Sequence, residues 1–278
     1  MENKLIIDAG MHLCEDTLYY LKKGFKVISI DADKNLVEKA VEKHADYINN
    51  GQLVVLNYAL SDVDNEEVQF NISKETLWNS INAEISDRNG NLQEKVSVPT
   101  QKLSSVIKKF GVPYYCKIDL EGYDNTALQT LKELEELPCF ISVETECLGE
   151  GQVITEEETL QTLNSLYELG YNKFKLVDQR TLSVLQLNQK FYKDQPTTQL
   201  GKLNKYLAYR VNLISRYDLK LNYTFPIGSS GYFGDDLKGE WVDYHTARKV
   251  LGKHRDDYFK TNKTLSFGFW CDWHAKKD

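Results

Sequence analysis

The sequence predicts an α/β protein in which a mostly parallel β-sheet is covered by helices on both faces. Three observations favour this class. Short apolar runs typical of buried strands alternate with helical patterns over the first 150 residues, several of these runs end in acidic residues, and no internal repeat interrupts the order. Such strand–helix–strand units are right-handed by the usual rule and place their strands in parallel.

The expected elements follow from periodicity and from helix stop signals such as Gly24. Buried strands are predicted at 4–10, 25–33, 52–60, 114–120 and 139–146. Helices are predicted at 16–24, 34–48, 102–111, 125–137, 156–170 and 242–259. Alternating patterns predict half-exposed strands at 66–73 and 94–101, and a closing hairpin at 171–187.

Two further segments decide the predicted domain organisation. Residues 74–93 are polar and are expected to form a mobile segment inserted between two strands. Periodicity weakens after residue 190, so we expect a first domain at 1–190 and a C-terminal extension at 191–278. No low-complexity linker separates the two, and the extension is therefore expected to pack on the first domain.

Composition limits the function. The chain has 278 residues, of which 41% are hydrophobic and 27% charged, an ordinary globular balance. Its net charge of −7 argues against binding to the phosphates of nucleic acids. No apolar run approaches the ~20 residues of a membrane span. Five cysteines without C-x-x-C spacing, and no secretory signal, predict reduced thiols in a cytoplasmic protein.

Acidic residues end three of the predicted parallel strands. Asp8, Asp31 and Asp119 are expected to converge at one crevice, because ligands of open α/β sheets bind beyond the carboxyl ends of the strands. Each acid could instead cap a helix or end a strand in solvent. Three acids at such positions favour a binding site over this alternative.

The spacing of these acids indicates a nucleoside cofactor. Asp31 follows the glycine turn by about 20 residues, the distance at which an acid accepts hydrogen bonds from a ribose diol. The turn has only Gly10, with His12 and Cys14 in its later positions, so a dinucleotide pyrophosphate is disfavoured. A cofactor with a ribose and no phosphate fits better, and S-adenosylmethionine is one.

Several motifs together resemble the FkbM-type S-adenosylmethionine-dependent methyltransferases. They are "IDAGMHLCEDTLYYLKKGFKVISIDAD", "NYALSD", "VPTQKLSSVIKKFGVPYYCKIDLEGYDNTALQTL" and "ISVETE". The K-I-D-x-E-G element of that family is present at 117–122, and the resemblance covers roughly residues 4 to 150. "GSSGYFGDDLKGEW" resembles a C-terminal segment of some members.

The resemblance implies a Rossmann-like methyltransferase fold with a mostly parallel, seven-stranded sheet. It also implies O-methylation of sugars or natural-product hydroxyls. His12 and Cys14 stand where the family usually has Asn and Gly. The cofactor-binding residues that it implies are Asp8, Gly10, His12, Asp31, Ala32, Ala59, Leu60, Asp62 and Asp119.

Asp119 and Glu121 are the predicted catalytic residues. Alternation along a strand would place both carboxylates on one side, where Asp119 faces the cofactor and Glu121 positions or deprotonates the acceptor hydroxyl. Lys117 is expected to neutralise the pair, and a salt bridge across the sheet is an equally good role for it. A small-molecule or saccharide acceptor is expected to contact Trp78, Ser80, Lys117, Glu144, Ser230 and Trp241.

A metal site and two other functions are alternatives to this prediction. Glu144, Glu146 and His12 could join the catalytic acids around an ion, but no H-x-x-x-H or D-x-D-x-D spacing supports one, so no metal is expected. A nucleotide-dependent oxidoreductase and a non-catalytic partner protein that retains the fold remain alternatives. A homo-oligomer is left open.

Overall fold

The computed structural model describes residues 4–74, 79–82, 86–87, 90–145, 155–189, 216–261 and 269–278. The chain divides into two compact units, Met1–Val143 and Glu144–Asp278. The predicted boundary at 190/191 lies outside the described residues, and that division into domains stays a prediction.

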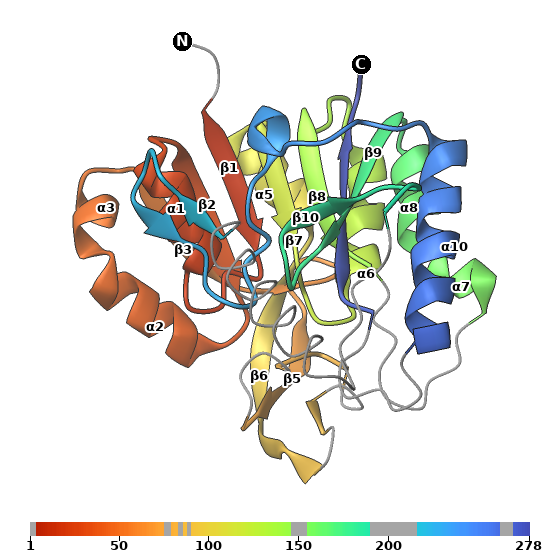
Figure 1. Ribbon diagram of the computed structural model, residues 1–278. Helices are drawn as coiled ribbons and strands as arrows, with labels where there is room; N and C mark the ends of the chain where they lie inside the picture. Colours follow the sequence, from red (N-terminus) through yellow and green to blue (C-terminus); the bar gives the residue numbers. More distant parts are fainter. Residues whose placement is uncertain are drawn as a thin grey trace, which may run out of the picture. The chain divides into compact units, whose positions relative to one another are not determined.

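The first unit is built on parallel strands (Figure 1), which are largely buried except for the half-buried strand at 53–57. They are β1 (Leu5–Ala9), β2 (Lys26–Asp31), β3 (Leu53–Asn57), β7 (Tyr115–Ile118) and the start of β8 (Phe140–Glu144). Ile7 of β1 pairs with Ile28 of β2 and with Cys116 of β7, which makes β1 the central strand of this unit. The continuous apolar runs of the sequence thus mark two-sided burial, as is usual for parallel sheets.

The helices of this unit are α1 (Glu15–Lys22), α2 (Lys34–Lys43), α3 (Ala45–Asn49), α5 (Leu103–Phe110), α6 (Asp124–Gln129) and the 3₁₀ helix η3 (Thr130–Glu133). Asp33 caps α2 by accepting a hydrogen bond from the Asn35 amide. The predicted helix at 34–48 is divided at His44, whose φ of −115° and ψ of 25° are not helical. The predicted helix at 125–137 tightens into η3 and ends early.

A small separate sheet follows β3 in the same unit. It contains β4 (Ala59–Leu60), β5 (Glu67–Ser73) and β6 (Leu92–Gln101) in the order β4-β6-β5, so the predicted inserted pair of strands is confirmed. The predicted strand at 52–60 is interrupted at Tyr58, and its last two residues pair with β6 instead. The predicted mobility of 74–93 falls largely outside the described residues.

The second unit contains the antiparallel hairpin of β9 (Lys173–Asp178) and β10 (Ser183–Leu185), as predicted. β13 (Cys271–Lys276) pairs antiparallel with the other edge of β9. The remaining elements are α7 (Glu156–Thr159), α8 (Gln161–Glu168), α10 (Tyr244–Thr261), η4 (Gly234–Asp236) and the short pair β11 (Tyr217–Asp218) and β12 (Tyr223–Thr224).

The strand order of the main sheet is β10-β9-β13-β8-β7-β1-β2-β3. The α/β fold class with a mostly parallel sheet is confirmed, but the predicted number of seven strands is wrong, because the sheet has eight. The difference is β13, a strand that the sequence analysis did not predict. Its first five residues are buried, polar and apolar alike, so it lacks the alternation of a half-exposed strand.

Among the described residues, no helix is long and apolar enough to cross a membrane.

Candidate active site

The turn after β1 brings two strand ends close together. Gly10 has a φ of 85°, and its amide and that of Met11 both donate to the Ile30 carbonyl, at 2.9 and 3.1 Å. A Cβ atom on Gly10 would lie only 1.8 Å from the carbonyl oxygen of Asp119. Only glycine fits at this position, both for its backbone conformation and for the close approach of the turn that follows β7.

Asp31 is the last residue of β2 and is half-buried beside the Gly10 turn. Its carboxylate accepts hydrogen bonds from the His12 amide at 3.0 Å and from the Asp33 amide at 2.9 Å. Burial raises the pKa of Asp31 to about 6, although these two hydrogen bonds oppose the shift. Each carboxylate oxygen accepts one backbone hydrogen bond and keeps further acceptor capacity for a ligand.

Two residues of the same turn have left-handed backbone conformations. His12 has a φ of 48°, and Cys14, the residue before α1, has a φ of 65°. Glu15 stabilises the turn, since its carboxylate accepts from the Leu13 amide at 3.0 Å and lies 3.0 Å from Nδ1 of His12. The buried Cys14 thiol contacts Met11, so the turn is packed despite the unfavourable φ of Cys14.

A buried lysine connects the carboxylates beneath this turn. The Lys117 ammonium lies 3.3 Å from a carboxylate oxygen of Asp119, 3.6 Å from Asp8 and 3.9 Å from Asp16. It also donates to the Gly10 carbonyl at 3.0 Å. Lys117, Asp8 and Asp16 are almost fully buried. Burial raises the pKa of Asp8 while the charge of Lys117 opposes that shift, so this lysine holds several acids in the interior.

The turn after β7 brings the two predicted catalytic acids together. A carboxylate oxygen of Asp119 and one of Glu121 lie within 4.8 Å of each other. β7 ends at Ile118 and Glu121 has a φ of 48°, so a turn and not strand alternation produces this proximity. Asp124 holds the turn by accepting from the amides of Leu120 and Gly122, at 2.7 and 3.0 Å. Burial and the Asp119 charge raise the pKa of Asp124 to about 6.

The inserted segment is anchored to both strand ends. The Asn79 side chain donates to Asp33 after β2 at 2.9 Å and accepts from the Ser73 amide at 2.8 Å. The Ser80 hydroxyl donates to the Glu121 carbonyl at 2.7 Å. Residues 79 and 80 therefore connect the insertion to Asp33 after β2 and to the turn after β7.

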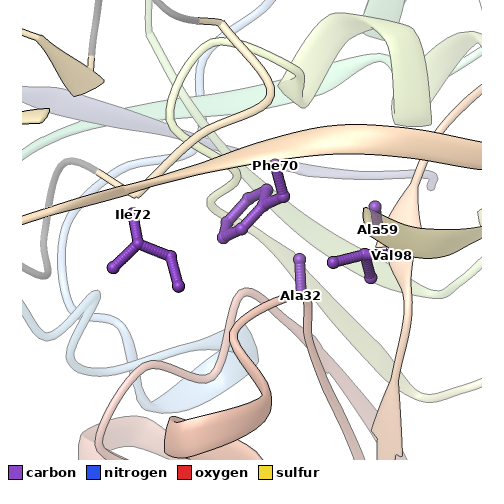
Figure 2. Close-up of a cluster of buried hydrophobic side chains, with 5 residues drawn as sticks. All are labelled: Ala32, Ala59, Phe70, Ile72 and Val98. Atoms are coloured by element: carbon purple, nitrogen blue, oxygen red, sulfur yellow. The ribbon is translucent and has the colours of Figure 1, made fainter. Parts of the chain in front are cut away.

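Two of the predicted cofactor-binding residues, Ala32 and Ala59, belong to an apolar cluster. Figure 2 shows that Ala32 and Ala59 point toward Phe70, Ile72 and Val98 of the inserted sheet. A second group of predicted residues follows directly in the chain: Leu60, which is buried, and Asp62, which is exposed.

The predicted acceptor-binding residues differ in their surroundings. Trp78 lies outside the described residues, Ser80 is fully buried, and Lys117 belongs to the ion network. In the second unit, Glu144 and Ser230 are buried. Trp241 is half-buried. The ammonium nitrogens of Lys175 and Lys276 lie over its ring, 4.1 and 5.5 Å from the ring centroid. Their contact with an acceptor, and the absence of a metal, stay predictions.

Sequence analysis missed several residues that position the site. Thr17 donates to Asp8 at 2.5 Å, and the Asn57 side chain donates to the carbonyls of Asp31 and Ala32 at 3.0 and 3.1 Å. Asp16, Asn79 and Asp124 belong to the same group. Asp124 alone had a usable signal, because Asp after a glycine turn often accepts hydrogen bonds from nearby backbone amides.

The family model of the methyltransferase FkbM domain matches residues 8–173, more than half of the chain. The chain belongs to the FkbM family of S-adenosylmethionine-dependent methyltransferases. The predicted family and cofactor are thereby confirmed, and the oxidoreductase alternative is wrong. The match contains the Asp8–Gly10 turn, Asp31 and the 117–122 motif.

Solved structures show weaker likeness. An FkbM methyltransferase from Methylobacillus flagellatus KT is 13% identical, with a TM-score of 0.37, over 62% of this chain and 39% of that one. A methyltransferase from Thiobacillus denitrificans in complex with S-adenosyl-L-homocysteine is 12% identical, with a TM-score of 0.39, over 99% and 85% of the two chains. A methyltransferase from Geobacter sulfurreducens, also in complex with S-adenosyl-L-homocysteine, is 12% identical, with a TM-score of 0.39, over 99% of this chain and 84% of that one. No curated protein matches the chain.

The residues of the first unit fit this cofactor. The carboxylate of Asp31 offers acceptors to a ribose diol, because each of its oxygens accepts only one backbone hydrogen bond. The broken glycine pattern provides no cradle for a pyrophosphate, and S-adenosylmethionine has none.

A first prediction concerns the strained turn. Replacing Cys14 with Gly or with Ala removes the same thiol contact, but only Gly relieves the left-handed φ. We expect the Cys14→Gly protein to be more stable than the Cys14→Ala protein by about 1 kcal/mol. Urea unfolding of both variants measures this difference, and equal stabilities would show that the turn is unstrained.

A second prediction concerns the ion network. Lys117→Met leaves buried carboxylates without their cation, and we expect it to lower the free energy of unfolding by about 3–5 kcal/mol. Adding Asp8→Asn should recover part of this loss because one of those charges is removed. Denaturant unfolding of the single and double variants tests the coupling, and purely additive losses would contradict it.

Proposed function

We propose that the protein transfers a methyl group from S-adenosylmethionine to a hydroxyl of a saccharide or a similar polar metabolite. The observation that carries the proposal is the pair of half-buried carboxylates, Asp119 and Glu121, within 4.8 Å of each other in the family motif. A hydroxyl is a poor nucleophile until its proton is removed, and a carboxylate can accept that proton.

The first unit supplies the cofactor contacts in this proposal. Asp31 accepts hydrogen bonds from the ribose hydroxyls, and the Gly10 turn with Asp8 and His12 lies against the amino-acid part. The segment from Ala59 to Asp62, with Ala32, borders the adenine. When bound, S-adenosylmethionine supplies an electrophilic methyl group on a positively charged sulfur.

The acids after β7 divide the chemical work. Glu121 orients the acceptor hydroxyl and takes its proton as the new carbon–oxygen bond forms. Asp119 contributes negative charge on the cofactor side, and Lys117 at 3.3 Å fixes its carboxylate. Since O-methylation needs no redox change, most of the rate comes from holding the hydroxyl in line with the methyl group.

The proposed setting is cytoplasmic, with a small polar acceptor. Cys14, Cys116, Cys139 and Cys271 are free thiols, as expected of a reducing compartment. The net charge of −7 disfavours a nucleic-acid acceptor. Residues of the second unit, including Glu144, Ser230 and Trp241, are proposed to contact the acceptor, with Trp78 and Ser80 of the insertion.

A non-catalytic family member is the second candidate. The left-handed φ of Cys14, at a position where the family usually has glycine, favours it. Calorimetry with S-adenosylmethionine and S-adenosylhomocysteine separates the two candidates, because a protein with a disabled turn would bind neither.

A third prediction tests the base. Glu121→Gln should lower kcat by about 10²- to 10⁴-fold, because the amide cannot accept the proton. Binding of S-adenosylhomocysteine should be unchanged. The exposed Glu135→Gln is the matched control and should leave kcat unaltered. A fully active Glu121→Gln enzyme would remove Glu121 from the chemistry.

A fourth prediction tests Asp31 through pH. The raised pKa of about 6 means that Asp31 gains a proton below that pH and can no longer accept both ribose hydrogen bonds. Affinity for S-adenosylhomocysteine should therefore fall about tenfold between pH 7 and pH 5. In Asp31→Asn the affinity should be low and independent of pH, whereas Asp46→Asn, on an exposed residue, should titrate like the wild type. Calorimetry over this range gives the comparison, and identical profiles for all three proteins would place the ribose elsewhere.

A further inference from the structure

In the second unit, polar residues from three parts of the chain lie together where β8 and β9 end and β13 begins; we call this end of the three strands the edge. The Thr145 amide, just after β8, donates to the Cys271 carbonyl at 2.8 Å, and the Gln179 amide, just after β9, donates to the Trp270 carbonyl at 3.2 Å. Cys271 also pairs with Asp178 in the sheet. Thr145, Cys271 and Gln179 therefore lie side by side at this edge.

The Gly/Ser-rich loop at 225–233 is fixed against the same edge. The buried guanidinium of Arg216 donates to the Gln179 carbonyl at 3.0 Å and to the Phe225 carbonyl at 3.0 Å. Gly231 approaches so closely that an added Cβ would lie 2.9 Å from the Leu182 side chain, in the turn after β9. These contacts hold Ser229 in a loop with a fixed place.

Three buried side-chain oxygens in this region have no hydrogen-bond partner in the described structure. They are Oγ1 of Thr145, Oε1 of Gln179 and Oγ of Ser229, in side chains that are 4%, 1% and 0% exposed. Buried polar atoms are nearly always hydrogen-bonded in folded proteins. Thr145 and Gln179 follow the two strands that flank β13, and Ser229 lies on the loop that Arg216 fixes to Gln179. Three such atoms indicate a site that a polar molecule completes.

The donor and acceptor inventory limits what that molecule is. The Gln179 amide nitrogen already donates to the Asp272 carboxylate, so the partner of Oε1 must itself be a donor. The charges of three carboxylates, those of Asp178, Asp272 and Glu144, act on Cys271, and the guanidinium groups of Arg180 and Arg216 offset only part of this negative charge. Hydroxyl groups can both donate to these oxygens and accept from the two hydroxyls. Phosphates and carboxylates offer no donor and would meet negative charge.

We propose that Thr145, Gln179 and Ser229 form a binding site for the hydroxyl groups of a saccharide or other neutral polyol. This hydroxyl-binding edge lies wholly within the second unit and recognises a ligand whose hydroxyl groups can donate hydrogen bonds to its three oxygens. The inference rests on the proposed function in one respect only, which is that this polyol is the acceptor to be methylated.

The test measures sugar binding to the full chain without cofactor. The probes are the methyl glycosides of glucose, galactose and mannose, with glucose 6-phosphate as the anionic counterpart, titrated by saturation-transfer NMR. We expect saturable binding of at least one glycoside and none of the phosphate. Thr145→Val and Ser229→Ala should each weaken that binding about tenfold, the value of one hydrogen bond of ordinary strength. Neither should lower the unfolding midpoint, since each removes a hydroxyl without a partner.

Thr159→Val is the matched control. Its buried hydroxyl donates to the Thr155 carbonyl at 2.8 Å, so the variant should lower the midpoint and leave glycoside binding unchanged. Absence of binding by every glycoside, binding by both edge variants as tight as by the wild type, or preferred binding of glucose 6-phosphate would overturn the proposal. Lower midpoints for both edge variants with unchanged binding would show that buried water alone fills the edge.

The same variants separate this inference from the proposed function. If glycosides bind and the edge variants weaken that binding, but no glycoside is methylated, the edge is correct and the proposed acceptor is wrong. If a glycoside is methylated and the KM of the edge variants equals that of the wild type, the function is correct and the edge is overturned.

Discussion

The interaction on which the first unit depends is the set of ion pairs made by the buried ammonium of Lys117. Its ion pairs reach Asp8 on β1, Asp16 on α1 and Asp119 after β7, and its hydrogen bond reaches the Gly10 carbonyl. One cation therefore joins the turn after β1, the helix α1 and the turn after β7. Moving a charge from water into the protein interior costs free energy. The nearby carboxylates offset that cost, and the ammonium of Lys117 is therefore stable inside the protein.

Backbone geometry is the second constraint, and it fixes the same two turns. Gly10 permits the close approach of the Asp119 carbonyl, which a side chain would block. Asp124 gathers the Leu120 and Gly122 amides and so supports the left-handed φ of Glu121. The orientation of the proposed base thus comes from hydrogen bonds to backbone amides, which are short and directional. Lys117 neutralises the buried carboxylates, and the two turns orient the side chains of Asp119 and Glu121.

The parts of the fold that follow from local patterns were predictable. Parallel strands buried on both faces leave long apolar runs, and the hairpin at β9 and β10 alternates clearly, so both were predicted from sequence. β13 was missed because its Asp272 and His274 are buried with its apolar residues, a pattern that indicates neither a half-exposed strand nor an apolar core strand. The predicted helix at 34–48 was too long because His44 leaves helical geometry without a proline or glycine to signal it.

The candidate site was predictable in its residue types and less so in its geometry. Acids at strand ends gave Asp31 and Asp119, because the end of a parallel strand is visible in sequence. The proximity of Asp119 and Glu121 was expected from strand alternation, whereas a turn with a positive φ produces it. Asp16 and Thr17 could not be assigned, because a helix residue shows its partner only once the helix packs on the sheet.

A few residues have conformations or buried polar groups that lower the stability of the fold, and their positions point to function. Cys14 and Glu121 have left-handed φ values, Asp8 keeps a carboxylate in the interior, and Thr145 leaves a hydroxyl without a partner. Each feature lowers stability, and a sequence selected for folding alone would remove it by a single substitution. Strain and unsatisfied polar groups concentrate where a protein binds or transforms a ligand. In the first unit they surround the cofactor turn and the proposed base, and in the second they mark the edge where hydroxyl groups would complete the hydrogen bonds that the chain leaves open.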